Sequence, residues 1–197
     1  MSDQISDKPT MDDAGFERFA KALQASRCYL EYGCGGSTVF ACETAKVETV
    51  ISVESDRAWS ERVKEKLTDT QTTLLIEHCD IGTVGEWGTP KTREKIGDFW
   101  RYMATPWDVA KAKNLRPDLI LVDGRFRVAS FLLSLVNARV GATILFDDYL
   151  NRPKYFEVEN FCRLREKCGR MGVFTVDLNY SIPDVCQAIA KYSIVWD

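Results

Sequence analysis

Short apolar segments alternate with longer polar or amphipathic segments along most of the chain. Such apolar runs predict buried strands, and the stretches between them predict helices. The predicted strands cover residues 28–32, 47–53, 72–77, 118–122 and 142–146. This alternation is typical of a parallel α/β sheet, whose crossover connections are right-handed.

Three helices are predicted between these strands. Residues 37–45 fit a short helix, and Ser55 or Asp56 can cap a second helix. The apolar face of that second helix assigns Trp59 to the core rather than to the wall of a ligand site. Residues 126–140 are apolar enough to predict a well-buried crossover helix.

One connection, residues 82–117, is longer than the others and carries three of the five tryptophans. Long aromatic connections are often lids or substrate-binding insertions. The aromatic side chains between residues 99 and 103 could line a pocket. At this spacing, however, we favour a helix that packs these side chains on the sheet.

Composition limits the function classes. The 197 residues are 45% hydrophobic without a long apolar run, which predicts one globular domain over residues 11–197. Residues 1–10 predict a polar, mobile tail rather than a signal peptide, and no membrane span is visible, so a cytoplasmic location is expected. A net charge of −3 argues against a nucleic-acid partner. Seven cysteines without a C-x-x-C pair predict reduced thiols, and a homodimer remains open.

A glycine turn follows the first predicted strand, where residues 29–38 read YLEYGCGGST. Gly33 and Gly35 allow a tight turn and a close ligand approach, and the helix that follows can attract an anionic group. The third small position of the dinucleotide fingerprint is occupied by Thr38, which weakens a dinucleotide interpretation.

The remaining pattern, E-x-G-x-G-x-S, resembles motif I of the class I S-adenosylmethionine-dependent methyltransferases. The resemblance implies an α/β, Rossmann-like, doubly wound and mostly parallel seven-stranded sheet with helices on both faces. It also implies an antiparallel hairpin at one sheet edge, for which residues 173–178 and 187–195 are the weak strand candidates after a helix at 155–167. In this family, Glu31, Gly33, Gly35 and Ser37 would bind S-adenosylmethionine.

A second feature supports this resemblance. Glu54 ends the second predicted strand, 21 residues after Gly33, at the spacing that one βαβ unit requires for an acid that accepts ribose hydroxyls. Asp80 follows the third strand, where the family commonly binds the adenine amino group, although an ordinary turn residue is an equal alternative. The only histidine, His78, lacks a nucleophile elbow and is assigned a structural role.

Three acids end the fourth and fifth predicted strands. In the doubly wound order, Asp123, Asp147 and Asp148 would converge at the carboxyl edge of the sheet, where a cation could neutralise them. The pattern is similar to the metal-dependent O-methyltransferases. By that resemblance the three acids would bind a divalent ion, Mg²⁺ or Ca²⁺, with Asp123 and Asp147 catalytic and Asp123 beside the cofactor.

Two observations work against the ion. Phe126 stands where many relatives carry a histidine after the Asp-Gly pair, and adjacent strand residues point to opposite faces. Arg125, Arg127 and Arg152 lie just beyond the acidic strand ends. They could bind an anionic substrate group or pair with the acids, and pairing would weaken the metal hypothesis.

The resulting hypothesis is S-adenosylmethionine-dependent methyl transfer to a hydroxyl of a small molecule, assisted by a divalent ion. The alternative is a non-catalytic module that has kept the glycine turn and lost the base. Neither the methyl acceptor nor the oligomeric state can be deduced from the sequence.

Overall fold

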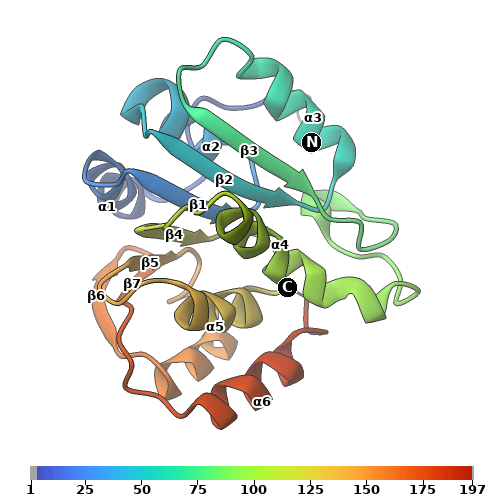
Figure 1. Cartoon of the computed structure of the whole chain (residues 1–197), viewed down its shortest axis with the longest axis vertical. Helices are drawn as coiled ribbons and strands as arrows, with labels where there is room; N and C mark the ends of the chain where they lie inside the picture. The colour runs from blue at the N-terminus through green and yellow to red at the C-terminus, as the bar shows by residue number, and fades with distance from the viewer. Residues whose placement is uncertain (1–3, 197) are drawn as a thin grey trace.

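A seven-stranded sheet forms the centre of the computed structural model, which describes residues 4–196 (Figure 1). The strand order is β3-β2-β1-β4-β5-β7-β6. β1 to β5 are mutually parallel, and β7 pairs antiparallel with both β5 and β6. The strands are β1 (Cys28–Tyr32), β2 (Thr49–Glu54), β3 (Thr73–His78), β4 (Leu119–Val122), β5 (Thr143–Phe146), β6 (Leu164–Cys168) and β7 (Met171–Thr175).

The order of the strands reverses between β1 and β4. The chain moves outward from β1 to β2 and β3, then returns to place β4 on the other side of β1. At such a switch point the loops after the two central strands diverge and leave room for a ligand at the carboxyl edge. The glycine turn after β1 and the Asp-Gly pair after β4 both lie there.

Helices cover both faces of the sheet (Figure 1). The four strands β1, β2, β4 and β5 are buried almost throughout because both of their faces are covered. One face carries α1 (Asp13–Gln24), α2 (Gly36–Val39), the wide helical turn η1 (Phe40–Ala45) and α3 (Arg57–Lys66). The opposite face carries α4 (Phe99–Ala112), α5 (Arg127–Asn137) and α6 (Ile182–Tyr192). Short 3₁₀ turns are η2 (Glu86–Gly88), η3 (Ile96–Asp98) and η4 (Pro153–Asn160).

These elements confirm the predicted fold class, its five parallel strands and the three predicted helices. In the long connection, Phe99, Tyr102 and Met103 are buried against the sheet, as favoured, whereas Trp100 is exposed. Within residues 82–98, Gly88 contacts Ser55 after β2 and Lys95 pairs with Asp80 after β3, so this segment borders the carboxyl edge of the sheet.

The predictions for the last third of the chain were wrong in detail. Residues 155–167 were predicted to be one helix, but the chain forms η4 and then enters β6 at Leu164. Residues 187–195 were predicted to be a strand, but most of them lie in α6. The apolar side chains there recur at helical spacing, with Pro183 in the first turn, and they pack against α5. The antiparallel pair is therefore β6 and β7.

The N-terminal segment lies against the domain from its first described residues. Ile5 is buried, its carbonyl accepts a hydrogen bond from Lys66, and Asp7 forms an ion pair with Lys66. Asp12 caps α1 by accepting from the backbone N–H of Gly15. The polar composition of residues 1–10 did not predict these contacts, and residues 1–3 lie outside the described part.

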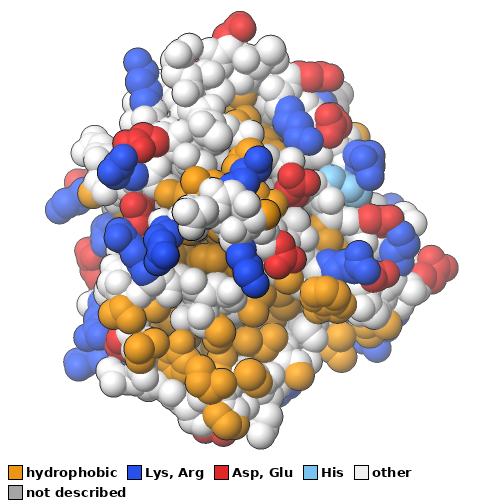
Figure 2. Space-filling view, in the orientation of Figure 1, with side chains coloured by type: hydrophobic (Ala, Val, Ile, Leu, Met, Phe, Trp, Pro, Cys, Tyr) orange, Lys and Arg blue, Asp and Glu red, His pale blue; other side chains and the backbone are white. Residues whose placement is uncertain are grey.

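Exposed apolar side chains gather around α6 and the end of α5, in the lower half of Figure 2. They belong to Val136, Leu178, Ile182, Ile194 and Val195. Among residues 4–196, no helix combines the length and the apolar character that a membrane span needs.

Candidate functional site

The glycine turn brings the ends of β1 and β4 into direct contact. Gly33 has φ +88°, and its N–H donates to the carbonyl of Val53 at 2.9 Å. A Cβ at Gly33 would lie 3.1 Å from the Cα of Gly124, in the loop after β4. Both the positive φ and this close approach favour glycine at position 33. The glycine turn and Asp123, which precedes Gly124, therefore lie side by side.

Glu31 lies behind this turn rather than at its open face. The side chain is fully buried, and its oxygens accept hydrogen bonds from Ser37 at 2.7 Å, Tyr29 at 2.8 Å and Thr38 at 2.5 Å. Burial raises the pKa of Glu31 to about 7, against the opposing effect of these hydroxyl donors. Glu31 and Ser37, both predicted to contact the cofactor, are hydrogen-bonded to each other and connect the end of β1 to the start of α2.

Glu54 faces the turn from the end of β2. One carboxylate oxygen accepts from the N–H of Cys34 at 3.2 Å, and the other from the N–H groups of Ser55 at 2.6 Å and Asp56 at 2.9 Å. Burial raises the pKa of Glu54, and these backbone donors oppose the shift. The predicted pair of glycine turn and acid is thus assembled, and this set of groups fits a cofactor with a ribose diol.

Two segments cover this site. The Ser55 hydroxyl donates to the carbonyl of Gly88 at 2.9 Å, so that η2 lies directly over Glu54, which is only 7% exposed. On the other side, a Cβ at Gly36 would overlap the carbonyl oxygen of Lys8, so the N-terminal segment lies across the start of α2. The η2 turn and the N-terminal segment therefore border the glycine turn on two sides.

The remaining residues predicted around the cofactor differ in exposure. Asp80 is exposed after β3, accepts from the N–H of Gly82 and pairs with Lys95. His78, the predicted structural histidine, lies 3.2 Å from the Ser55 carbonyl. Trp59 was assigned to the core, yet it is half-buried and its indole N–H donates to the carbonyl of Cys34 at 2.6 Å. Trp59 therefore forms part of the wall beside the glycine turn.

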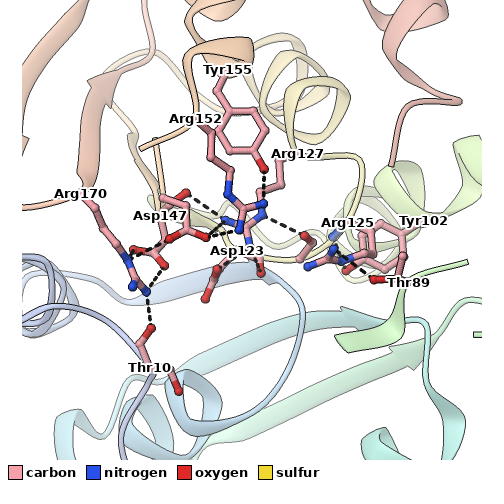
Figure 3. Close-up of polar contacts among 12 residues, drawn as sticks. Thr10, Thr89, Tyr102, Asp123, Arg125, Arg127, Asp147, Arg152, Tyr155 and Arg170 are labelled. Atoms are coloured by element: carbon pink, nitrogen blue, oxygen red, sulfur yellow. Dashed lines mark hydrogen bonds and ion pairs between the residues drawn. The ribbon is translucent and has the colours of Figure 1, made fainter. Parts of the chain in front are cut away.

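The three acids at the ends of β4 and β5 do converge, but arginines bind them (Figure 3). Arg127 pairs with Asp123 at 3.0 Å and with Asp148 at 3.4 Å, and it is only 5% exposed. Its guanidinium also donates to the carbonyls of Gly124 at 3.0 Å, Asp147 at 3.0 Å and Asp123 at 3.2 Å. Arg127 therefore holds the two loops at the carboxyl edge together.

Arg170 is the residue that the sequence interpretation missed. It holds Asp147 with two hydrogen bonds, from Nε at 3.1 Å and from a terminal nitrogen at 2.8 Å, and its Nε lies 3.0 Å from Asp148. Asp148 also pairs with Arg152 at 2.9 Å. Gly169, just before Arg170, could have indicated a turn between two strands. The helix predicted at 155–167 left no strand before that turn, so the hairpin was not predicted.

A left-handed residue explains how adjacent acids can share partners. Asp148 has φ +57°, so the chain has left the strand and both Asp147 and Asp148 reach Arg170. The objection that adjacent residues point to opposite faces therefore does not apply here. The interpretation as partners of the acids is confirmed for Arg127 and Arg152. Arg125, the third arginine of that prediction, instead donates from its backbone N–H to the Tyr102 hydroxyl at 3.3 Å and from its guanidinium to the Thr89 hydroxyl at 3.5 Å.

These acids do not fit the predicted divalent ion. Their three carboxylates already pair with three guanidiniums, so the negative charge that would attract a divalent ion is balanced. No group of three metal-ligating side chains suited to an ion is found within residues 4–196. The prediction of Mg²⁺ or Ca²⁺ bound by Asp123, Asp147 and Asp148 is corrected accordingly.

Asp123 and Asp147 differ in accessibility. The Asp123 side chain is 28% exposed, whereas Asp147 is 1% exposed and bound by Arg170. Burial raises the pKa of Asp123, and the guanidinium of Arg127 opposes that shift. Asp123 is thus the acid of this cluster that a ligand at the switch point could reach.

Known structures share this fold. A methyltransferase-like protein from Silicibacter pomeroyi is 34% identical, with a TM-score of 0.86 over 97% of this chain and 99% of the other. An O-methyltransferase from Bacillus cereus, in complex with SAH, is 13% identical with a TM-score of 0.56 over 86% of this chain and 84% of the other. A methyltransferase from Geobacter sulfurreducens is 14% identical, with a TM-score of 0.52 over 86% and 82%. No family model and no curated protein sequence matches the chain.

Proposed function

Because the chain belongs to the class I S-adenosylmethionine-dependent methyltransferases, we propose that it methylates a hydroxyl oxygen of a small molecule. The observation that carries the proposal is the Glu54 carboxylate, which faces the glycine turn at the switch point of the sheet. Bound S-adenosylmethionine would supply an electrophilic methyl group there. The choice of oxygen as acceptor rests on the accessible carboxylate of Asp123.

In this proposal, each side of the site has a separate task. Glu54 accepts the ribose hydroxyls, and the glycine turn at Gly33 and Gly35 lets the ligand approach the backbone. Asp80 receives the adenine amino group once its contact with Lys95 opens. Trp59 adds a flat apolar wall beside Cys34.

Asp123 is the proposed general base. The raised pKa of Asp123 lies nearer to neutral pH than that of an ordinary aspartate. A carboxylate with such a pKa can accept the proton of an acceptor hydroxyl as the oxygen is methylated. Asp147 was predicted to be catalytic, but it is bound by Arg170 and nearly inaccessible. We therefore assign Asp147 a positioning role.

The two covering segments would act as movable walls. Residues 85–89 lie over Glu54 and the N-terminal segment lies over Gly36, so their displacement would admit the cofactor and their return would exclude water. Trp87, in the first segment, is 65% exposed and has φ +59°, a conformation that is uncommon for a bulky residue. This segment belongs to residues 82–117, which were predicted to be a lid or a substrate-side insertion.

Calorimetry of S-adenosylmethionine and S-adenosylhomocysteine tests the cofactor site. Glu54→Gln should weaken binding by at least about tenfold, because a charged hydrogen bond to a ligand is worth about 1.5–3 kcal/mol. Glu48→Gln, which removes an exposed carboxylate paired with Arg27, is the matched control and should bind normally. Equal affinities in wild type and Glu54→Gln would refute the site.

Turnover decides between an enzyme and a binding module. Wild type should methylate at least one member of a panel of hydroxylated compounds, and EDTA should not reduce the rate. Asp123→Asn should lower turnover by about 10²–10⁴-fold, the usual contribution of a general base, while cofactor affinity is retained. Tight cofactor binding without turnover on any hydroxyl, amine or carboxylate acceptor would instead support the non-catalytic alternative.

A further inference from the structure

Arg170 forms ion pairs with the acid cluster at the end of β5. Two neighbouring carboxylates, those of Asp147 and Asp148, aim at one guanidinium, with nitrogen to oxygen distances of 2.8 to 3.1 Å. Arg127 bridges Asp148 to the third acid, Asp123, in the same way. We propose that these guanidiniums take the place of a divalent ion, and that removing Arg170 alone converts the cluster into a Ca²⁺ or Mg²⁺ site.

The C-terminal hairpin explains how Arg170 reaches this position. β7 runs antiparallel to β5 with Phe146 opposite Gly172, and the N–H of Leu150 donates to the carbonyl of Arg170 at 3.0 Å. The hairpin turn therefore delivers the arginine beside the acids that follow β5. An arginine in this turn is a covalent part of the site, whereas a bound ion exchanges with solvent.

Charge balance supports the same conclusion. Three carboxylates face three guanidiniums, those of Arg127, Arg152 and Arg170, all within 3.4 Å of a carboxylate oxygen. Hard divalent ions prefer clustered oxygen ligands, but only where the charge of those ligands is not already neutralised. Loss of Arg170 would remove the ion pair of Asp147 and would leave Asp148 paired with Arg127 and Arg152.

The left-handed backbone at Asp148 is what makes the conversion feasible. With φ +57°, the residue turns its carboxylate toward the same point as that of Asp147. The carbonyl of Asp147, which accepts from Arg127 at 3.0 Å, lies in the same region. The inference concerns ion binding alone, so it stands whether or not the chain methylates a hydroxyl.

Calcium titration of EDTA-treated protein tests the exchange. Wild type should give no binding heat and no thermal shift in millimolar Ca²⁺. Arg170→Gln should be stabilised by Ca²⁺ and bind it at least about tenfold more tightly than wild type, in the range of weak sites with few carboxylates. Arg165→Gln removes a comparable exposed guanidinium, paired with Asp177 at 3.1 Å, and should behave as wild type.

Two further variants separate ion binding from general loosening. Arg170 also donates to the carbonyl of Thr10, so its loss also releases a contact of the N-terminal segment. Arg170→Lys keeps the charge and should bind no Ca²⁺. Adding Asp148→Asn to Arg170→Gln should abolish the gained binding, because a ligand is removed while the freed segment is unchanged.

Each outcome of these titrations either supports or overturns the proposal. Calcium binding to wild type as tight as to Arg170→Gln would overturn the proposal, and so would the absence of any calcium response in a folded Arg170→Gln. If Arg170→Gln folds only with Ca²⁺, the proposal is supported. If Arg170→Gln does not fold at all, the test passes to Arg152→Gln, which removes a half-exposed partner of Asp148. Calcium must then stabilise Arg152→Gln, although by less than the effect expected for Arg170→Gln, or the proposal fails.

Discussion

Replacement of Glu31 by glutamine should change how the stability of the protein depends on pH. Glu31 is fully buried behind the glycine turn, and burial raises its pKa from 4.5 to about 7. At about 1.4 kcal/mol for each pKa unit, this rise corresponds to about 3 kcal/mol. The raised pKa means that folding favours the protonated acid.

The direction of the effect follows from that preference. The stabilisation from protonated Glu31 is fully present below about pH 4.5 and is lost as the pH rises through about 7. Glutamine cannot ionise, so Glu31→Gln lacks this loss. The free energy of unfolding of wild type, relative to the variant, should therefore fall by about 2–3 kcal/mol between about pH 5 and pH 8.

Urea unfolding of both proteins across this pH range measures the difference. Subtraction of the variant from wild type removes the contributions of all other titrating groups, including Asp123. Glu61→Gln, at an exposed ion pair with Lys64, should leave the pH profile unchanged. Parallel stability curves for wild type and Glu31→Gln would show that Glu31 titrates normally, and the account of its burial would be wrong.

Three further substitutions test the contacts around the site. Gly36→Ala should overlap the Lys8 carbonyl and displace the N-terminal segment, and unchanged protection of that segment from limited proteolysis would contradict the contact. Gly124→Ala should overlap the hydroxyl of Tyr102 and cost about 1–3 kcal/mol in urea unfolding, and a fully stable variant would show that this crowding is relieved without cost. Arg127→Met leaves buried carboxylates without their partner and should cost about 3–5 kcal/mol, so a loss below about 1 kcal/mol would place the pair in the class of surface ion pairs.

The parallel part of the sheet could be predicted because its strands are buried on both faces. β1, β2, β4 and β5 are apolar runs, and their lengths and spacing fix the alternation with helices. The antiparallel edge could not be predicted in the same way. β6 is largely exposed and reads Leu-Arg-Glu-Lys-Cys, a composition that equally suits a helix. Its strand state depends on pairing with β7, which is a tertiary effect.

The candidate site also has one part that the sequence predicted and one part that it did not. Glu54 and the glycine turn could be predicted because their separation along the chain is that of one βαβ unit. The partner of the acids could not, because Arg170 is brought to Asp147 by a hairpin that local sequence did not reveal. Asp147 and Asp148 alone are compatible with an ion or with arginines, and only the position of β7 decides between them.

Replacements of Glu31 and Glu54, the two acids beside the glycine turn, should also have different effects. Glu31 has both oxygens occupied behind the turn and touches no open surface, so its replacement should act on stability and its pH dependence. Glu54 lies in front of the turn, beneath η2, and is the proposed ribose ligand, so its replacement should act chiefly on cofactor affinity. The two acids that the sequence assigned to one cofactor site would therefore have different roles, Glu31 in stability and Glu54 in ligand binding. If both substitutions altered cofactor affinity and stability alike, the separate roles assigned to Glu31 and Glu54 would be wrong. The hydrogen bonds from Ser37 and Thr38 to Glu31 would then not keep the turn rigid.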